Sequence, residues 1–227
     1  MGDVTWSVVA LMIGAIVPSI ILHEVSHGVV ALWLGDDTAK RAGRITLNPI
    51  KHIDPFGTVV LPMFLAISHA PVFGWAKPVP VNYRRLHNPR RDMVLVALAG
   101  PGMNLLLGLI GTAILAATIM LSGGADGGAA AIVAANALNF LLINIFLAVF
   151  NLLPVPPFDG GHVVEGLLPR SLARSFRKIG RYSLLVLVIL LLILPAISPS
   201  ANVVGRVVTP IVNTIATAFL RIFGLVA

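Results

Sequence analysis

The chain has 227 residues, of which 57% are hydrophobic and only 11% are charged, and its formal net charge is +7. Soluble domains contain about 25% charged residues, so this composition is typical of a membrane protein. The lack of cysteine excludes disulfides and thiolate metal sites. We expect no nucleic-acid partner, because 14 of the 16 Lys and Arg residues lie in three short segments between apolar runs, at 40–51, 77–91 and 170–181.

Several long uncharged runs indicate helices that cross a bilayer, since about 18 or more apolar residues are enough to span it. The first apolar run continues directly into HEVSH, without a charged or cleavable break. We therefore predict an all-α, polytopic membrane protein in which residues 1–227 form a single domain, with a core at about 4–165. The expected helices lie at about Val4–Leu34, Arg91–Leu121, Ala130–Asn151, Ser183–Ile197 and Val203–Ile222.

An insertion at about 42–83 interrupts this pattern of long helices. Residues 58–68, TVVLPMFLAIS, are apolar but short for a membrane span, and basic segments flank them on both sides. A segment that enters the membrane and returns to the same side fits these charges, provided that it is buried in protein or lines a cavity. The alternation of Val and Pro in 73–83 favours an extended strand at the edge of a sheet. We therefore predict a short re-entrant segment or β-hairpin.

The basic segments also predict an orientation. Short loops rich in Lys and Arg mark the cytoplasmic side of a membrane, and anionic lipid headgroups attract them. The turn at 122–128, SGGADGG, has no basic residue and is expected outside. We therefore expect the N-terminus outside the membrane and the C-terminus in the cytoplasm.

Residues 23–27, HEVSH, place two histidines and a glutamate on the first apolar helix. His23 and His27 are four residues apart, so they lie on one helix face and can bind one zinc ion, with Glu24 beside them as general base. Ionisable residues within a membrane helix are costly and are candidates for function. The alternative is that these histidines only form hydrogen bonds between helices.

A third ligand is needed, since catalytic zinc takes three protein ligands and keeps a fourth position for water. Asp159 lies in NLLPVPPFDGG, after a proline-rich break and before two glycines. Such a break lets the backbone approach a metal closely. The alternative role for Asp159 is to cap a helix or a turn.

Five motifs together resemble those of the site-2 protease family of intramembrane zinc metalloproteases, and they occur in the family's order. They cover about the first 165 residues, and their joint occurrence is far more specific than HEVSH alone. One departure is Phe158, where the family usually has Leu. The motifs are HEVSH (23–27), LNPIKHIDPFG (47–57), FGWAKPVPVN (73–82), ALAGPGMN (97–104) and NLLPVPPFDGGH (151–162).

The resemblance implies one catalytic Zn²⁺ bound by His23, His27 and Asp159, with Glu24 as catalytic base. It also implies a three-helix core, with the zinc below the cytosolic surface of a prokaryotic cell membrane, and a transmembrane protein as substrate. Larger relatives carry a PDZ or a CBS domain; no such domain is evident in this chain, which looks like the minimal form. A metal transporter and an inactive scaffold remain alternatives; a transporter is expected to carry more ionisable residues along a path.

Three further polar residues are weaker candidates for the site. Asn151 and Asn104 are candidates to bind the substrate backbone or stabilise the oxyanion, or they link helices. His52 is a candidate to support a zinc ligand from behind, although loop histidines are often solvated. The extended segment 73–83 is a candidate to pair with an unwound strand of the substrate.

Overall fold

A computed structural model describes residues 6–68, 74–124, 127–198, 200 and 202–226, and the side chains from Gly14 onward. Within these ranges the chain forms helices and no β-strand. The predicted all-α class is therefore confirmed. Four of the described segments are long and apolar enough to cross a membrane: Gly14–Trp33, Pro89–Ser122, Gly128–Asn151 and Arg170–Ile197.

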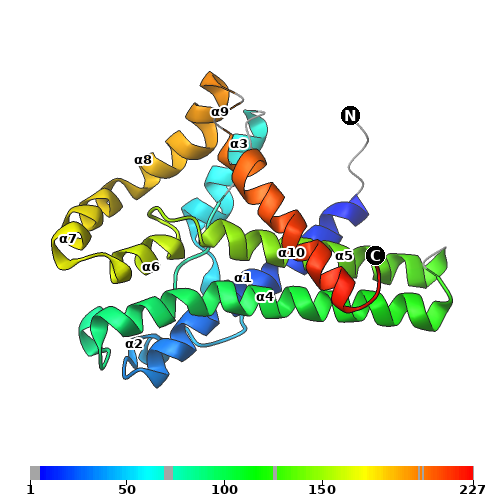
Figure 1. Cartoon of the computed structure of the whole chain (residues 1–227), viewed down its shortest axis with the longest axis horizontal. Helices are drawn as coiled ribbons and strands as arrows, with labels where there is room; N and C mark the ends of the chain where they lie inside the picture. Colours follow the sequence, from blue (N-terminus) through cyan, green and yellow to red (C-terminus); the bar gives the residue numbers. More distant parts are fainter. Residues whose placement is uncertain (1–5, 69–73, 125–126, 199, 201, 227) are drawn as a thin grey trace.

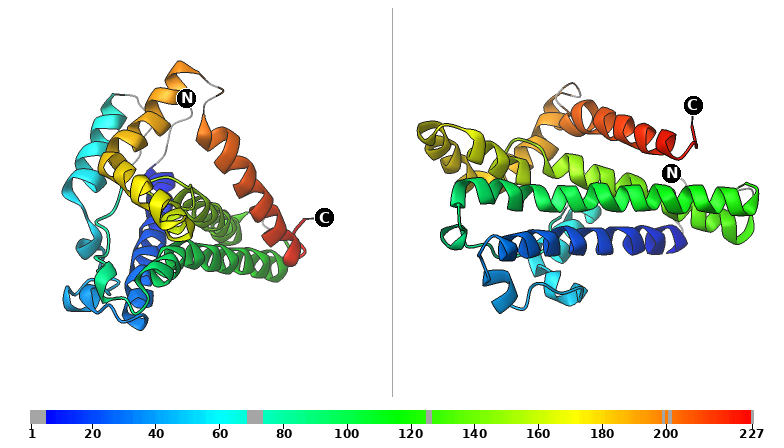
Figure 2. Two further views of the ribbon diagram at one scale, coloured as in Figure 1. Left: turned by 60° about the vertical axis from the view of Figure 1, so that its left-hand side comes forward. Right: turned by 60° about the horizontal axis from the view of Figure 1, so that its bottom comes forward.

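Three long helices form the core of the molecule, as predicted. They are α1 (Trp6–Trp33), α4 (Pro89–Ser122) and α5 (Gly128–Asn151), which run side by side in Figures 1 and 2. Glycine lets α4 and α5 pack closely, because a Cβ atom on Gly111 would lie 3.1 Å from the backbone nitrogen of Leu141. Close packing over small residues is a general means of helix association in membranes.

The insertion between α1 and α4 contains short helices rather than a β-hairpin. These are α2 (Thr38–Arg41), η1 (Pro49–His52), η2 (Pro55–Val60), α3 (Leu61–Ile67) and η3 (Tyr83–Arg85).

Capping residues explain why the insertion turns into helices. The Asn48 side chain accepts a hydrogen bond from the backbone of Ile50, and the Asp54 side chain accepts two, from Phe56 and Gly57. Each cap is followed by a proline at the first helical position, which favours helix initiation. The hairpin alternative is therefore wrong for the described part of 42–83; residues 69–73 lie outside the described ranges. The predicted re-entrant segment remains a prediction.

The C-terminal part contains two helices that were not predicted, α6 (Asp159–Leu167) and α7 (Arg170–Ile179). A short turn, η4 (Gly180–Tyr182), leads to α8 (Ser183–Val188), η5 (Ile189–Ile193) and α9 (Leu194–Ile197), which together match the span predicted at 183–197.

The last predicted span, 203–222, corresponds to η7 (Val204–Val208) and α10 (Thr209–Ile222) and is not among the four candidates. η7 (5 residues) and α10 (14 residues) are continuous and measure about 28 Å at 1.5 Å per residue, which is close to a hydrocarbon core of about 30 Å. This helix packs on α5, where Val208 of η7 and Val212 of α10 join the buried cluster around Leu141 and Ile145.

The three basic segments gather at one end of the bundle. Figures 1 and 2 show α2, the start of α4 and α7 at this end, whereas the turn between α4 and α5 lies at the opposite end. The C-terminal end of α10 points toward that opposite end. The fold thus brings together positive segments that are far apart in the sequence.

Candidate metal centre

Three side chains from two helices meet in the interior of the bundle. His23 Nε2 and His27 Nε2 of α1 lie 3.1 Å and 3.4 Å from Oδ2 of Asp159, the first residue of α6. The two Nε2 atoms lie 3.1 Å apart. All three potential ligand atoms lie within 4.8 Å of one another, and both histidines are buried. The fold therefore unites HEVSH with an aspartate that follows it by more than 130 residues.

The second ring nitrogen of each histidine has a hydrogen-bond acceptor as its partner. His23 Nδ1 lies 2.5 Å from Asn104 Oδ1, and His27 Nδ1 lies 2.7 Å from the carbonyl oxygen of Val96. Since an acceptor requires a donor opposite it, each Nδ1 carries the proton and donates it. In the neutral ring each Nε2 is then left with a lone pair.

The three atoms that face one another are consequently all electron-pair donors. Asp159 Oδ2 is buried and has no hydrogen-bond partner among the residues that the structure describes. Two imidazole nitrogens and a carboxylate oxygen repel at this distance without a cation between them, and they form a ligand set that zinc accepts. The residues present therefore fit a zinc ion.

Gly100 of α4 makes room for the two histidines. A Cβ atom at this position would lie 2.5 Å from His27 Nε2 and 2.6 Å from His23 Nε2. Gly100 lies within the motif ALAGPGMN, and the pair of imidazoles packs against it. The role of Gly100 against the histidines is visible only in the structure.

The two glycines after Asp159 determine where its carboxylate lies. A Cβ atom on Gly160 would collide with the carbonyl oxygens of Leu152 and Leu153, and one on Gly161 would lie 2.9 Å from the backbone nitrogen of Pro156. The first turn of α6 can therefore press against the chain that precedes it. The side chain of Asp159 then points to α1 and does not cap its own helix.

Glu24 is held by the extended segment 74–82 of the insertion. Its Oε2 accepts a hydrogen bond of 2.8 Å from the backbone N–H of Val79. The same segment is tied down at Lys77, whose N–H donates to the carbonyl of His52 and whose carbonyl accepts from Arg44. The contact of Glu24 with this segment could not be foreseen from the sequence.

The hydrogen bonds along 74–82 alternate, and this limits how a substrate strand would pair with it. Trp75, Lys77 and Val79 each donate their N–H to the chain itself. The intervening residues are Ala76, Pro78 and Pro80, and proline has no N–H to donate. Between Trp75 and Val81 the opposite edge therefore offers carbonyl acceptors and the N–H of Ala76 as its one donor. If a substrate strand pairs with this segment, we expect it to pair along that edge.

The weaker sequence candidates have other surroundings. Asn104 is fully buried, and its Nδ2 donates to Asn144 Oδ1 at 2.9 Å and to the Ser19 carbonyl at 3.3 Å, so its amide is occupied by the chain itself. Asn151 donates to the Leu147 carbonyl of its own helix at the end of α5. His52 is buried in η1, where Nε2 lies 2.9 Å from the Thr46 carbonyl. Substrate contact by either asparagine remains a prediction, and the contacts of Asn104 favour a role in orienting His23.

Asn144 belongs to the same buried network, although no motif in the sequence distinguishes it. Its Nδ2 donates to Ser19 Oγ at 2.8 Å, so that α5 is linked to α1 behind the metal centre. An asparagine on an apolar helix can have several structural roles, and only the contact with Ser19 in the folded chain shows that Asn144 links α5 to α1.

Comparison with known proteins agrees with this geometry. Residues 116–194 match peptidase family M50. The protein named "Putative zinc metalloprotease YwhC" from Bacillus subtilis is 36% identical over 220 residues, which cover 96% of this chain and 93% of that protein. "Putative zinc metalloprotease Rip2" is 30% identical over 194 residues in Mycolicibacterium smegmatis, covering 85% of this chain and 68% of that protein. In Mycobacterium tuberculosis it is 31% identical over 184 residues, covering 81% and 67%. No solved structure matches the chain. The chain therefore belongs to peptidase family M50, the site-2 protease family of zinc metalloproteases.

Proposed function

We propose that this protein is a zinc-dependent intramembrane endopeptidase that hydrolyses peptide bonds in or near the transmembrane segments of other membrane proteins, as in regulated intramembrane proteolysis. One observation carries the proposal: His23 Nε2, His27 Nε2 and Asp159 Oδ2 converge within 4.8 Å, beside Glu24, inside a bundle of helices long enough to span a membrane. A buried site within such a bundle suits a substrate that itself lies in the bilayer.

In this proposal His23, His27 and Asp159 hold a single zinc ion, and Asn104 and the Val96 carbonyl orient the two imidazoles. A bound zinc ion supplies a Lewis acid and lowers the pKa of water at the site. Glu24 accepts the proton of the attacking water and passes it to the leaving amine. The hydrogen bond from Val79 fixes Oε2 of Glu24, so that Oε1 remains to take that proton. Asn151 contacts the substrate at the end of α5.

The site opens toward the cytoplasm in this proposal. Leu34 lies just after the end of α1 where the basic segments gather, and His23 precedes it by 11 residues. His23 is therefore about 16 Å along the helix from that end of the bundle. That depth is compatible with both a transmembrane substrate and a supply of water. We propose a prokaryotic cell membrane, with the N-terminus outside, and reporter fusions at both termini test this orientation. The cytoplasmic C-terminus remains a prediction, which the direction of α10 does not favour.

The decisive experiment compares wild-type protein with Glu24→Gln in cells, by mass spectrometry of membrane-derived peptides. We expect cleavage products that depend on Glu24, while the purified variant keeps its zinc, measured by elemental analysis. His23→Ala provides the matched control, because it should lose both zinc and products. A metal transporter would keep its transport with Glu24→Gln, and an inactive scaffold would yield identical peptides in all three cells; either result would refute the proposal.

A further inference from the structure

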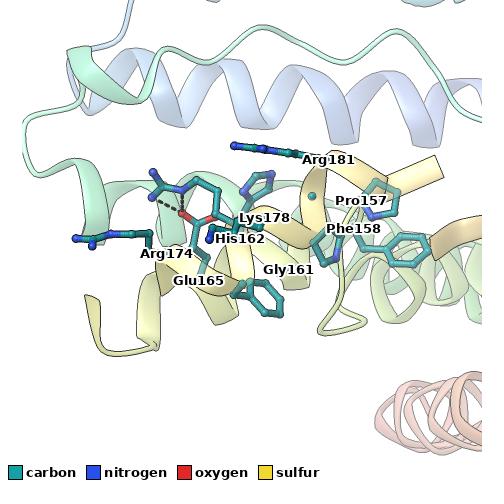
Figure 3. Close-up of a pocket in the computed structure, with 12 residues that line it drawn as sticks. Pro157, Phe158, Gly161, His162, Glu165, Arg174, Lys178 and Arg181 are labelled. Carbon is teal, nitrogen blue, oxygen red and sulfur yellow. Dashed lines mark hydrogen bonds and ion pairs between the residues drawn. The ribbon is translucent and has the colours of Figure 1, made fainter. Parts of the chain in front are cut away.

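A cavity lies between α6, the turn that precedes it and α7. Its volume is about 500 Å³. Figure 3 shows Pro157, Phe158 and Gly161 on one wall and His162 and Glu165 of α6 beside them. The remaining wall comes from α7 and the turn after it, which contribute Arg174, Phe176, Arg177, Lys178, Gly180 and Arg181.

The charges around this cavity do not balance. Among the described residues, Glu165 is the one acidic residue that lines it, and its Oε1 pairs with Arg177 at 2.5 Å. The other three lining cations, Arg174, Lys178 and Arg181, form no ion pair with any described residue. Arginine and lysine bind phosphate oxygens well, Arg through its planar fork and Lys as a point charge. The cavity thus fits an anion of the phosphate class.

The surroundings of the cavity favour a lipid as the source of that anion. The basic residues of α7 lie on one helix face, whereas Leu172, Phe176 and Ile179 lie on the other, and Leu172 and Ile179 are 55% and 43% exposed. A helix with a cationic face and an exposed apolar face is typical of the boundary between membrane and water.

The chain passes from this helix directly into an apolar one. Arg181 lies two residues before α8, and the first apolar residues of α8, Leu184 and Leu185, are 51% and 53% exposed. A phosphate held by Arg181 would therefore lie next to an apolar surface on which acyl chains can rest. Clusters of Lys and Arg beside a membrane helix generally bind anionic lipid headgroups.

We propose that this cavity binds the headgroup phosphate of one anionic phospholipid, with Arg174, Lys178 and Arg181 as its cationic ligands. The site is separate from the proposed chemistry, because none of these three residues touches the metal centre. It binds lipid whether or not the protein is a protease.

The test uses the purified full-length protein in nanodiscs of phosphatidylcholine with or without phosphatidylglycerol, and native mass spectrometry counts the lipid that remains bound. Wild type should retain one phosphatidylglycerol per chain. Replacing all three cations with glutamine should weaken this retention by about 100-fold, since each cation near an anionic headgroup contributes roughly a factor of five.

Two variants serve as controls. Replacing the exposed cations Lys40, Lys51 and Arg84 with glutamine removes the same charge away from the cavity and should leave retention unchanged. Arg174→Lys combined with Arg181→Lys keeps the charge and should retain the lipid. Equal Tm values in pure phosphatidylcholine show that every variant is folded.

Three results would overturn the proposal. The first is equal retention by the triple cavity variant and by wild type. The second is an equal loss of lipid in the control with Lys40, Lys51 and Arg84 replaced, which would mean a general charge effect. The third is displacement of the lipid by inorganic phosphate or by a poly-glutamate peptide at the same concentration, which would mean that the site is built for a soluble anion.

Discussion

Substitution of Gly100 by alanine tests the metal centre most directly, because it places a single methyl group against the two histidine rings. The added carbon would lie 2.5 Å from His27 Nε2 and 2.6 Å from His23 Nε2. Carbon and nitrogen atoms in comfortable contact lie about 3.5 Å apart. Each ring, or the whole of α4, must therefore retreat by about 1 Å.

The expected cost follows from this displacement. A misplacement of about 1 Å in a catalytic site lowers the rate by on the order of 100-fold. Disturbed orientation of metal ligands weakens metal binding by about 10- to 100-fold. The helix itself does not suffer, since alanine is the better helix former by about 1 kcal/mol. The loss is therefore confined to the site.

Gly102→Ala is a matched control on the same helix, since no atom lies within 4 Å of the added carbon in the described structure. The assay measures cleavage of a membrane substrate by purified enzyme, together with zinc content after dialysis against a weak chelator. We expect Gly100→Ala to lose about 100-fold in kcat/KM and most of its zinc, and Gly102→Ala to match wild type. Activity and zinc content within a factor of two for both variants would refute the placement of α4 against the histidines.

Three other substitutions or treatments test neighbouring contacts. Asn104→Leu removes the acceptor of His23 Nδ1 and should weaken zinc binding by about 10- to 100-fold, measured by competition with a chromogenic chelator. Asn136→Leu is the control and should bind zinc like wild type, because the exposed Asn136 donates to the Ile132 carbonyl of its own helix. Val79→Pro removes the N–H that holds Glu24 and should lower kcat by about 10- to 100-fold while zinc is retained. Val79→Ala keeps this N–H and should lower kcat far less. Equal kcat values for the two variants would rule out a role of the Val79 N–H in positioning Glu24. Chelation of zinc from wild type should lower Tm by roughly 5–10 °C if the metal is present at about 100 times its Kd, and an unchanged Tm would mean that the folded chain holds no such ion.

The insertion shows where sequence patterns were insufficient. The alternation of Val and Pro at 78–81 indicated a strand, but a strand needs a partner along its edge, and the prolines remove the donors on one side. The other side bonds to loop carbonyls and to Glu24, all of them distant in sequence. Local propensity correctly predicted the extended backbone of this segment but gave no information about its hydrogen-bond partners.

Local physics was sufficient wherever periodicity and hydropathy decide the outcome. Uncharged runs determine which segments can lie in lipid, because an unpaired charge there is too costly. The spacing of His23 and His27 determines that both imidazoles share a helix face, because a helix repeats every 3.6 residues. The long apolar helices and the adjacency of the two histidines are therefore readable from the chain alone, whereas the packing of three of these helices into one core was implied by the family resemblance.

Long-range packing decided the rest of the site. Asp159 meets the histidines because Gly160 and Gly161 let α6 press against the backbone before it, and Gly100 meets them because α4 crosses α1 at that point. Neither distance follows from residue spacing, since the contacts join segments separated by more than 70 residues. The hydrogen bond that Val79 donates to Glu24 is of the same kind: it depends on how two elements dock, and no pattern within either element encodes it.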